Sequence, residues 1–282
     1  MPKLNLSNEE LNNIIFDYTN GMSMTNIGKK YHHDPKTLKR YFQEHNLNIK
    51  LRNKSEALQC SQKKKESDNL KRKYLVKDNY FSIQNNKMAY FLGFLMADGN
   101  VSKTNNRVQV CLSELDKDFL NLFYNEIGGS PVAQYTVNNG KQKICRWECI
   151  SSQIKKDLMD YDVIPNKTGF AKIPSKLNKE FYPDFIRGYF DGDGSVWIEK
   201  NTGAVGFNIT SHNPEILEQI IEYFEENNIP KVKIKTDNRN NINYSFKYRK
   251  KACEKIYSLL YYSNECICMK RKLDKFTEIL KK

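Results

Sequence analysis

Two stretches, YFLGFLMADGNV (residues 90–101) and FIRGYFDGDGSV (residues 185–196), decide how this 282-residue chain is organised. Each reads as an aromatic-rich helix with a central glycine, a small residue four positions later and a final Asp-Gly pair. The matching positions are Gly93 with Gly188, Ala97 with Gly192, and Asp98 with Asp193. Residues four apart share one helix face, so each helix has a flat stripe that another backbone can approach closely. We expect the two helices to pack together and to set two repeats about a pseudo-twofold axis.

The segments that follow the two helices also match. Each copy continues with a short strand, a turn, a strand of alternating apolar and polar residues, a helix, two further strands and a closing helix. In the first copy the alternating strand spans 107–112, and in the second it includes Val205, Phe207 and Ile209. The predicted fold class is α+β, with tandem αββαββα repeats over residues 80–180 and 181–282 and one sheet in each repeat.

The two aspartates require an explanation other than stability. Asp98 and Asp193 are 95 positions apart, and each lies in the last turn of its helix, where the macrodipole disfavours negative charge. One Asp-Gly pair is an ordinary helix end, but two in the same context are not. Packing of the helices would bring the carboxylates together, and their repulsion favours a bound cation. Two hard oxygen ligands beside a basic surface indicate a divalent-metal site suited to phosphodiester chemistry.

Residues 91–99 and 186–194 resemble the two signature helices of LAGLIDADG homing endonucleases in their single-chain form. The resemblance implies two sheets that form a saddle over DNA, Mg²⁺ (or Mn²⁺) bound by Asp98 and Asp193 with Ala97 and Gly192 beside them, and a monomer. It also implies cleavage of both strands across the minor groove, with 3′ overhangs, at a long and imperfectly palindromic target. Met96 stands where the second motif has Asp191, a position that does not bind metal in the family.

The same resemblance implies a basic residue late in each repeat, near the active site. Lys167 occupies that place in the first repeat. In the second repeat the candidates are Lys270, Arg271 and Lys272, of which Lys272 is favoured. The alternative is that these are ordinary solvated lysines in a lysine-rich chain.

Composition indicates a polyanionic partner and an intracellular site. The chain carries 46 Lys and Arg against 33 Asp and Glu, a net charge of +13, which favours nucleic acid through counterion release. It has no long apolar run and no signal-like N-terminus, so we expect neither membrane insertion nor secretion, but the cytoplasm or nucleoid of a bacterium or phage-infected cell, or an organelle. Cys145, Trp147 and Cys149 alternate on a predicted strand, as core residues do, which disfavours zinc.

Residues 1–48 are predicted to form three short helices. The third begins at Asp34-Pro35 and is basic, so the unit resembles a helix-turn-helix that places Lys36, Lys39 and Arg40 in the major groove. The alternative is a basic bundle that only docks on the rest of the protein. Residues 49–79 read as a basic linker, since residues 50–77 hold ten Lys or Arg against three acids.

Strand alternation predicts which side chains face DNA. In each predicted strand the polar residues lie opposite the apolar ones, and Arg, Lys and Gln are the types that read base edges and phosphates. The candidates are Arg107, Gln109, Gln134, Arg146, Lys231, Lys233, Lys235, Lys247 and Arg249.

The main hypothesis is a site-specific, intron-encoded homing endonuclease, part of a mobile genetic element, acting on double-stranded DNA. Two alternatives share the scaffold. One is a DNA-binding regulator that does not cleave, although such a descendant is expected to have lost an acid. The other is a maturase that binds its own intron RNA, which the sequence does not separate from the nuclease.

Overall fold

The computed structural model describes residues 4, 6–45, 51–53, 56, 73–137, 140–199, 201, 203–238 and 242–281. The chain divides into two compact units, residues 1–73 and residues 74–282. Most of the predicted linker lies outside the described residues, including its basic positions Lys50, Lys54, Lys63, Lys64, Lys65, Lys71 and Arg72.

The N-terminal unit contains three helices, α1 (Asn8–Thr19), α2 (Met24–Lys30) and α3 (Pro35–Glu44). Each begins at a polar cap whose side chain accepts a backbone N–H, Ser7 at 3.1 Å, Ser23 at 3.2 Å and Asp34 at 2.9 Å. One small cluster fills the space between them, with Ile14, Ile27 and Leu38 fully buried. The expected three-helix arrangement is therefore present, and its use as a helix-turn-helix stays a prediction.

The C-terminal unit begins earlier than the linker prediction implies. Val76 forms a β-bridge with Gly128, and the Lys77 N–H donates to the Ile127 carbonyl at 2.9 Å. Ser151 donates to the Asp78 carboxylate. Residues 74–79 therefore belong to the C-terminal unit, because their backbone bonds to residues 127–129 of the first repeat.

The first repeat follows the predicted order. Its elements are α5 (Asn86–Asp98), β1 (Gly99–Val101), β2 (Arg107–Ser113), the 3-10 turn η1 (Glu114–Asp116), α6 (Lys117–Ile127), β3 (Ala133–Val137), β4 (Gln142–Ile150) and α7 (Ser152–Asp160). The strands form an antiparallel sheet in the order β1-β2-β4-β3. Helix α6 packs on β2 and β4, and Cys145, Trp147 and Cys149 point into this core as predicted.

The second repeat has the same layout. After the 3-10 turn η2 (Lys179–Phe181), its elements are α8 (Tyr182–Asp193), β5 (Gly194–Ile198), β6 (Val205–Ser211), α9 (Pro214–Glu226), β7 (Lys235–Asp237), β8 (Asn243–Arg249), α10 (Lys250–Leu260) and α11 (Lys270–Leu280). Its sheet has the order β5-β6-β8-β7, and α9 packs on β6 and β8. The predicted tandem αββαββα fold is confirmed.

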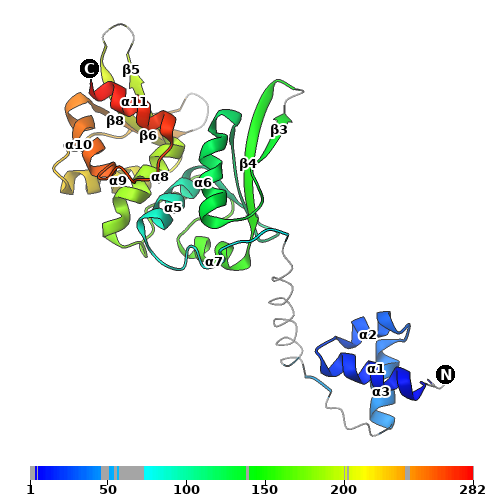
Figure 1. Cartoon of the computed structure of the whole chain (residues 1–282). Coiled ribbons are helices and arrows are strands. Elements are labelled where there is room, and N and C mark those ends of the chain that lie inside the picture. Colours follow the sequence, from blue (N-terminus) through cyan, green and yellow to red (C-terminus); the bar gives the residue numbers. More distant parts are fainter. Residues whose placement is uncertain are drawn as a thin grey trace. The chain divides into compact units, whose positions relative to one another are not determined.

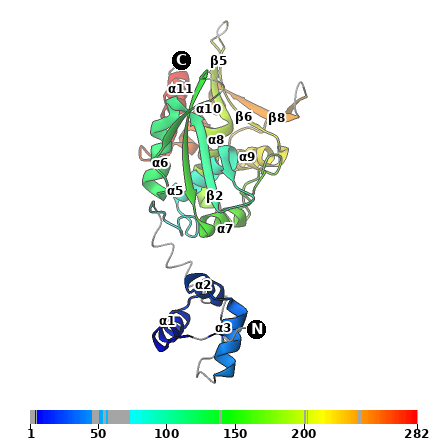
Figure 2. The same cartoon turned by 90° about the vertical axis from the view of Figure 1, so that its right-hand side faces the viewer.

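Helices α5 and α8 lie against each other in the centre of the C-terminal unit (Figures 1 and 2). Their glycines make this contact possible. A Cβ atom added at Gly93 would overlap the Phe185 carbonyl, and one at Gly188 would overlap the Tyr90 carbonyl. The two backbones touch through these positions, as the flat stripes predicted. No helix within the described residues is long and apolar enough to cross a membrane.

Candidate active site

The two signature aspartates end the two central helices. Helix α5 stops at Asp98 and α8 at Asp193, and the glycine after each residue opens the first strand of its repeat. Asp98 Oδ2 lies 3.4 Å from the position that a Cβ on Gly192 would take. The carboxylate of one repeat therefore lies against the helix end of the other, where the packing argument placed it.

The surroundings of both carboxylates disfavour their charged forms. Burial raises the pKa of Asp98, and the nearby Lys272 and Lys167 ammonium groups oppose that shift. Burial, together with the Asp98 charge, raises the pKa of Asp193 to about 6, although the Tyr189 hydroxyl beside it acts the other way. Raised pKa values of two neighbouring carboxylates are expected at a site that binds a cation.

Both predicted lysines reach the same helix ends. Lys167 Nζ donates to the Ala97 carbonyl at 2.8 Å. Lys272 Nζ lies within hydrogen-bond distance of four carbonyls near the end of α8, those of Phe190, Asp191, Gly192 and Gly194, at 2.6–3.1 Å. Positive charge at a helix C-terminus offsets the macrodipole and the acids placed there.

The two lysines are not equivalent. Lys272 is only 8% exposed, and its four carbonyl partners exceed the three protons of an ammonium group. Burial lowers its pKa to about 8. Lys167 is half-buried and has a single hydrogen bond to the described residues. The Lys272 ammonium therefore holds the end of α8, while Lys167 keeps donors that can face a phosphate, and a catalytic role for either lysine stays a prediction.

The donor set fits Mg²⁺. The two carboxylates are hard oxygen donors, and the Ala97 and Gly192 carbonyls beside them each also accept from a lysine. Mg²⁺ binds through one or two carboxylates while substrate phosphate and water complete its shell. Among the described residues no group of three or more His, Cys, Asp or Glu side chains could hold a metal by itself.

Asp191 forms a buried link between the repeats that the motifs did not indicate. Asp191, only 1% exposed, accepts hydrogen bonds from the Tyr90 hydroxyl of α5 and from the Met269 N–H, each at 2.7 Å. Met269 is the residue before α11, which carries Lys272. Asp191 thus joins the first repeat to the helix that supplies the lysine. Burial raises its pKa to about 6, and the two hydrogen bonds oppose the shift.

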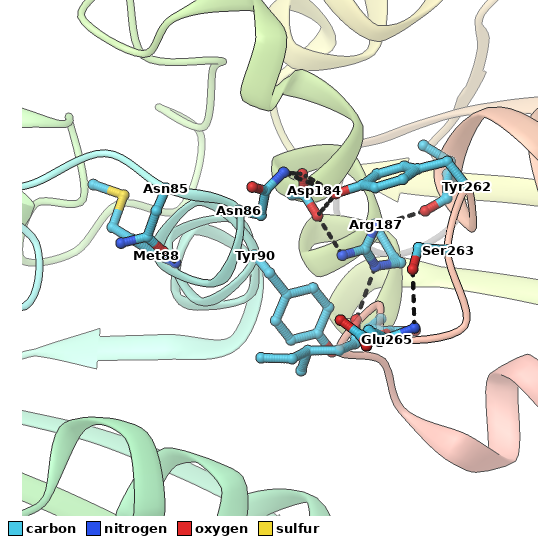
Figure 3. Close-up of polar contacts among 12 residues, drawn as sticks. Asn85, Asn86, Met88, Tyr90, Asp184, Arg187, Tyr262, Ser263 and Glu265 are labelled. Atoms are coloured by element: carbon cyan, nitrogen blue, oxygen red, sulfur yellow. Dashed lines mark hydrogen bonds and ion pairs between the residues drawn. The ribbon is translucent and has the colours of Figure 1, made fainter.

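A second polar cluster lies at the other end of α8 (Figure 3). The buried Arg187 donates to Asp184 and to the Leu260 and Ile267 carbonyls, and Tyr262 and Asn86 donate to Asp184. A cavity of about 420 Å³ borders this cluster. The corresponding first-repeat residues are Ala89 and Leu92, so the buried polar residues are specific to the second repeat.

Replacing Asp191 should separate this link from ordinary core packing. Asp191→Met copies the first repeat and leaves Tyr90 and Met269 without an acceptor. We expect a loss of about 2 kcal/mol in unfolding free energy, since each orphaned buried donor costs about 1–3 kcal/mol and removal of a buried carboxylate offsets part of it. Met96→Leu, at the equivalent position, should cost less than about 1.5 kcal/mol. Urea denaturation of both variants measures the difference, and equal losses would contradict the assigned link.

The predicted DNA-facing residues divide by register. Arg107 and Gln109 on β2 and Arg146 on β4 share the face opposite the buried Val108 and Trp147. Lys235, Lys247 and Arg249 share the outer face of the second sheet. Gln134 does not share the face of Arg146, because it pairs with the inward Cys145, so that placement was wrong. A shift of one residue moves a side chain to the other face.

Five further candidates for DNA contacts lie outside the paired strands of the two sheets. Lys231 and Lys233 are exposed beside the half-buried Val232 and Ile234, as expected, but they precede the strand, which begins at Lys235. Lys231 forms an ion pair with Glu225 at 3.3 Å. In the N-terminal unit, Lys36, Lys39 and Arg40 are exposed on α3, and Arg40 lies 3.7 Å from Glu44.

Residues 180–281 match the family model described as a LAGLIDADG-like domain. Two curated proteins of Methanocaldococcus jannaschii align with larger parts of the chain. One is the DNA-directed RNA polymerase subunit Rpo1C (31% identity over 67% of this chain), and the other is a probable translation initiation factor IF-2 (28% over 59%). The chain spans only 22% and 16% of the length of these relatives.

Among solved structures, two homing endonucleases in complex with DNA are similar. I-WcaI, bound to its recognition sequence, has 16% identity and a TM-score of 0.48, covering 70% of this chain and 91% of its own. I-AabMI, bound to uncleaved DNA, has 15% identity and a TM-score of 0.47, covering 68% and 89%. The family match spans the second repeat from η2 to α11 and includes the helix that ends at Asp193. The family match confirms the resemblance in the second repeat of this chain, which matches a LAGLIDADG-like domain.

Proposed function

We propose that this protein is a site-specific endonuclease that hydrolyses phosphodiester bonds in both strands of DNA with Mg²⁺. One observation carries the proposal: two carboxylates from two repeats meet at the ends of helices whose backbones touch, with two lysines around them. Neither helix needs an acid there for its own stability. The fused repeats suit a long, imperfectly palindromic target, a monomer, cleavage across the minor groove and 3′ overhangs.

The roles of the residues follow from their contacts. Asp98 and Asp193 would hold the ion, with the carbonyls of Ala97 and Gly192 beside them. Bound Mg²⁺ would supply positive charge at the phosphate that is cut. The Tyr189 hydroxyl, which lies beside Asp193 and 3.1 Å from Ser211 Oγ, would orient Asp193. Lys167 faces the phosphate, and Lys272 and Asp191 keep the end of α8 in place.

The test is cleavage of a randomised double-stranded DNA library by the full chain, with Mg²⁺ or with EDTA. We expect cuts in both strands at one recurrent sequence, with 3′ overhangs, in Mg²⁺ alone. Binding without cleavage, under Mg²⁺ and Mn²⁺ alike, would overturn the nuclease and favour the regulator. Binding restricted to a structured intron RNA would favour the maturase. A match of cleavage site and intron insertion site would establish the intron-encoded, mobile nature of the gene.

Mg²⁺ should stabilise the protein only where the carboxylates are ionised. At about pH 7.5, above the Asp193 pKa of about 6, a tenfold excess of Mg²⁺ over its Kd should add about 1.4 kcal/mol, or about 3–6 °C in Tm. At about pH 5 the increase should vanish, because protonated acids bind the ion poorly. In EDTA, without Mg²⁺, the pH dependence is the opposite. The pKa values of Asp98 and Asp193 are higher in the folded than in the unfolded protein, so the stability should fall as the pH rises through about 4–6. Thermal melts at both pH values check this, and a Tm increase that ignores pH would contradict it.

Deleting residues 1–73 should weaken DNA binding and leave cleavage intact. The deletion removes the three helices with Lys36, Lys39 and Arg40, and keeps the segment around Val76 that completes the C-terminal unit. Each lost phosphate contact should reduce the slope of log K against log salt by about 0.9. Binding titrations at several salt concentrations measure this. The same affinity and slope as the full chain would show that the helices only dock.

A further inference from the structure

The outer faces of the two sheets carry different chemistry at equivalent positions. In the first sheet Asn100, Gln109 and Glu148 lie side by side across β1, β2 and β4. In the second sheet the same row is Ser195, Asn208 and Lys247. A carboxylate in one repeat thus corresponds to an ammonium in the other. An acid on a face meant for DNA weakens binding to phosphates, so its presence needs a reason.

The first row holds two acceptors that receive no hydrogen bond from the described residues. Gln109 Oε1 and Glu148 Oε2 are both shielded from solvent, and neither has a hydrogen-bond partner among the described residues. Leaving such an atom unpaired costs about 1–3 kcal/mol. In the second row, by contrast, Ser195 donates to Asn208 Oδ1 at 2.6 Å. Gln109 Oε1 is left without a donor, and Glu148 Oε2 has only an ion pair with Arg146, so this row can still accept from a ligand with an amino group.

The same face presents an arginine that is already held in place. Arg146 Nη2 donates to the Tyr135 hydroxyl at 2.7 Å, and the guanidinium lies 4.5 Å from the centre of that ring. Its Nε lies 3.4 Å from Glu148 Oε2. A guanidinium fixed on two sides loses little entropy when its remaining donors bind. Donors and acceptors are therefore presented together, as the edge of one base pair requires.

From this arrangement we infer that the row around Glu148 reads a C·G base pair in the major groove. Glu148, with Gln109 beside it, accepts from the cytosine N4 amino group, and Arg146 donates to the O6 and N7 of guanine, which are the pairings that these groups favour. Lys247, exposed at the equivalent position and 5.9 Å from the centre of the Trp197 ring, binds phosphate and does not distinguish bases. The inference rests on the proposed function: specificity is concentrated in the first repeat's half of the target, and salt-dependent affinity in the second.

The experiment compares the full chain with Glu148→Gln and Lys247→Gln, which neutralise equivalent positions. Each protein selects binding sites from a randomised duplex library, and its affinity for the wild-type site is titrated against salt. Glu148→Gln should lose the preference for C·G at one position by about tenfold or more while keeping the salt slope. Lys247→Gln should keep every base preference and reduce the slope by about 0.9.

Two results would overturn the inference, and a third would overturn the proposed function itself. An unchanged selected sequence for Glu148→Gln, with uniformly tighter binding, would overturn the inference and make Glu148 a plain surface acid. A changed base preference for Lys247→Gln would overturn the division between the repeats. If the wild-type protein selects no DNA, the proposed function itself fails, and this result differs from both.

Discussion

Asp98→Asn and Asp193→Asn should each abolish cleavage while leaving DNA binding at its wild-type affinity. An amide keeps the shape of the carboxylate but removes its charge, and the loss of one electrostatic stabiliser of a transition state typically costs on the order of a hundred- to a thousandfold in rate. Binding depends on the sheets and the basic residues, not on the helix ends. Single-turnover cleavage with saturating enzyme measures the rate apart from affinity.

The matched control is Asp116→Asn. Asp116 also acts electrostatically on Asp98, but it is bound by Arg271 at 2.7 Å and belongs to η1. Its replacement should leave cleavage within a few-fold of wild type. The two active-site variants should also melt at or above the wild-type temperature in EDTA, because each removes a carboxylate whose pKa is raised in the folded protein. Full cleavage by either variant would remove the basis of the proposed function.

Gly93→Ala should destabilise the C-terminal unit strongly. The new Cβ would meet the Phe185 carbonyl, part of the backbone of α8 and unable to rotate away. Overpacking of this kind costs about 3 kcal/mol, which corresponds to about 6–12 °C in Tm. Thermal and urea unfolding of the full chain measure the loss. Gly188→Ala meets the Tyr90 carbonyl and should behave alike.

Gly192→Ala is a control in which a second substitution can relieve the steric clash. Its Cβ would meet the Cβ of Ala97, which is a side chain. The double variant Ala97→Gly with Gly192→Ala exchanges the two residues and keeps the total volume, so it should recover most of the stability lost by Gly192→Ala alone. No exchange of side chains rescues Gly93→Ala. If Gly93→Ala and wild type unfold alike, the two backbones are not in contact.

Periodicity and repetition predicted most of the architecture. The paired motifs led to two repeats, two sheets and a helix pair, because Gly93 and Gly188 leave few other ways to bury two aromatic helices. The sheet faces were predictable wherever a strand had clear alternation, as around Val108. They failed at Gln134, in a strand too polar to fix its own register. The start of β7 was missed for a different reason: Val232 and Ile234 alternate as in a strand and pack on the core, but the strand begins only at Lys235.

The polar core of the second repeat was not predictable in the same way. In the sequence, Asp191 was only a mismatch with Met96 at the same position of the first motif. Its partners Tyr90 and Met269 are distant in sequence. Asp184 and Arg187, three apart in an apolar helix, were a signal that could have suggested a buried ion pair. The sequence also did not show that Lys272 would be buried and Lys167 only half-buried. That difference depends on where α11 begins in the folded chain.

The contact between α5 and α8 also has a consequence for synthesis. The two helices are about 95 residues apart in the sequence, so at translation rates of about 5–20 residues per second α5 is made roughly 5–20 s before its partner. During that interval its aromatic face has only the first sheet to cover it. A nascent chain paused between the repeats would expose the glycine stripe to other copies of itself. The yield of correctly folded protein should thus depend on how quickly the ribosome completes the second repeat.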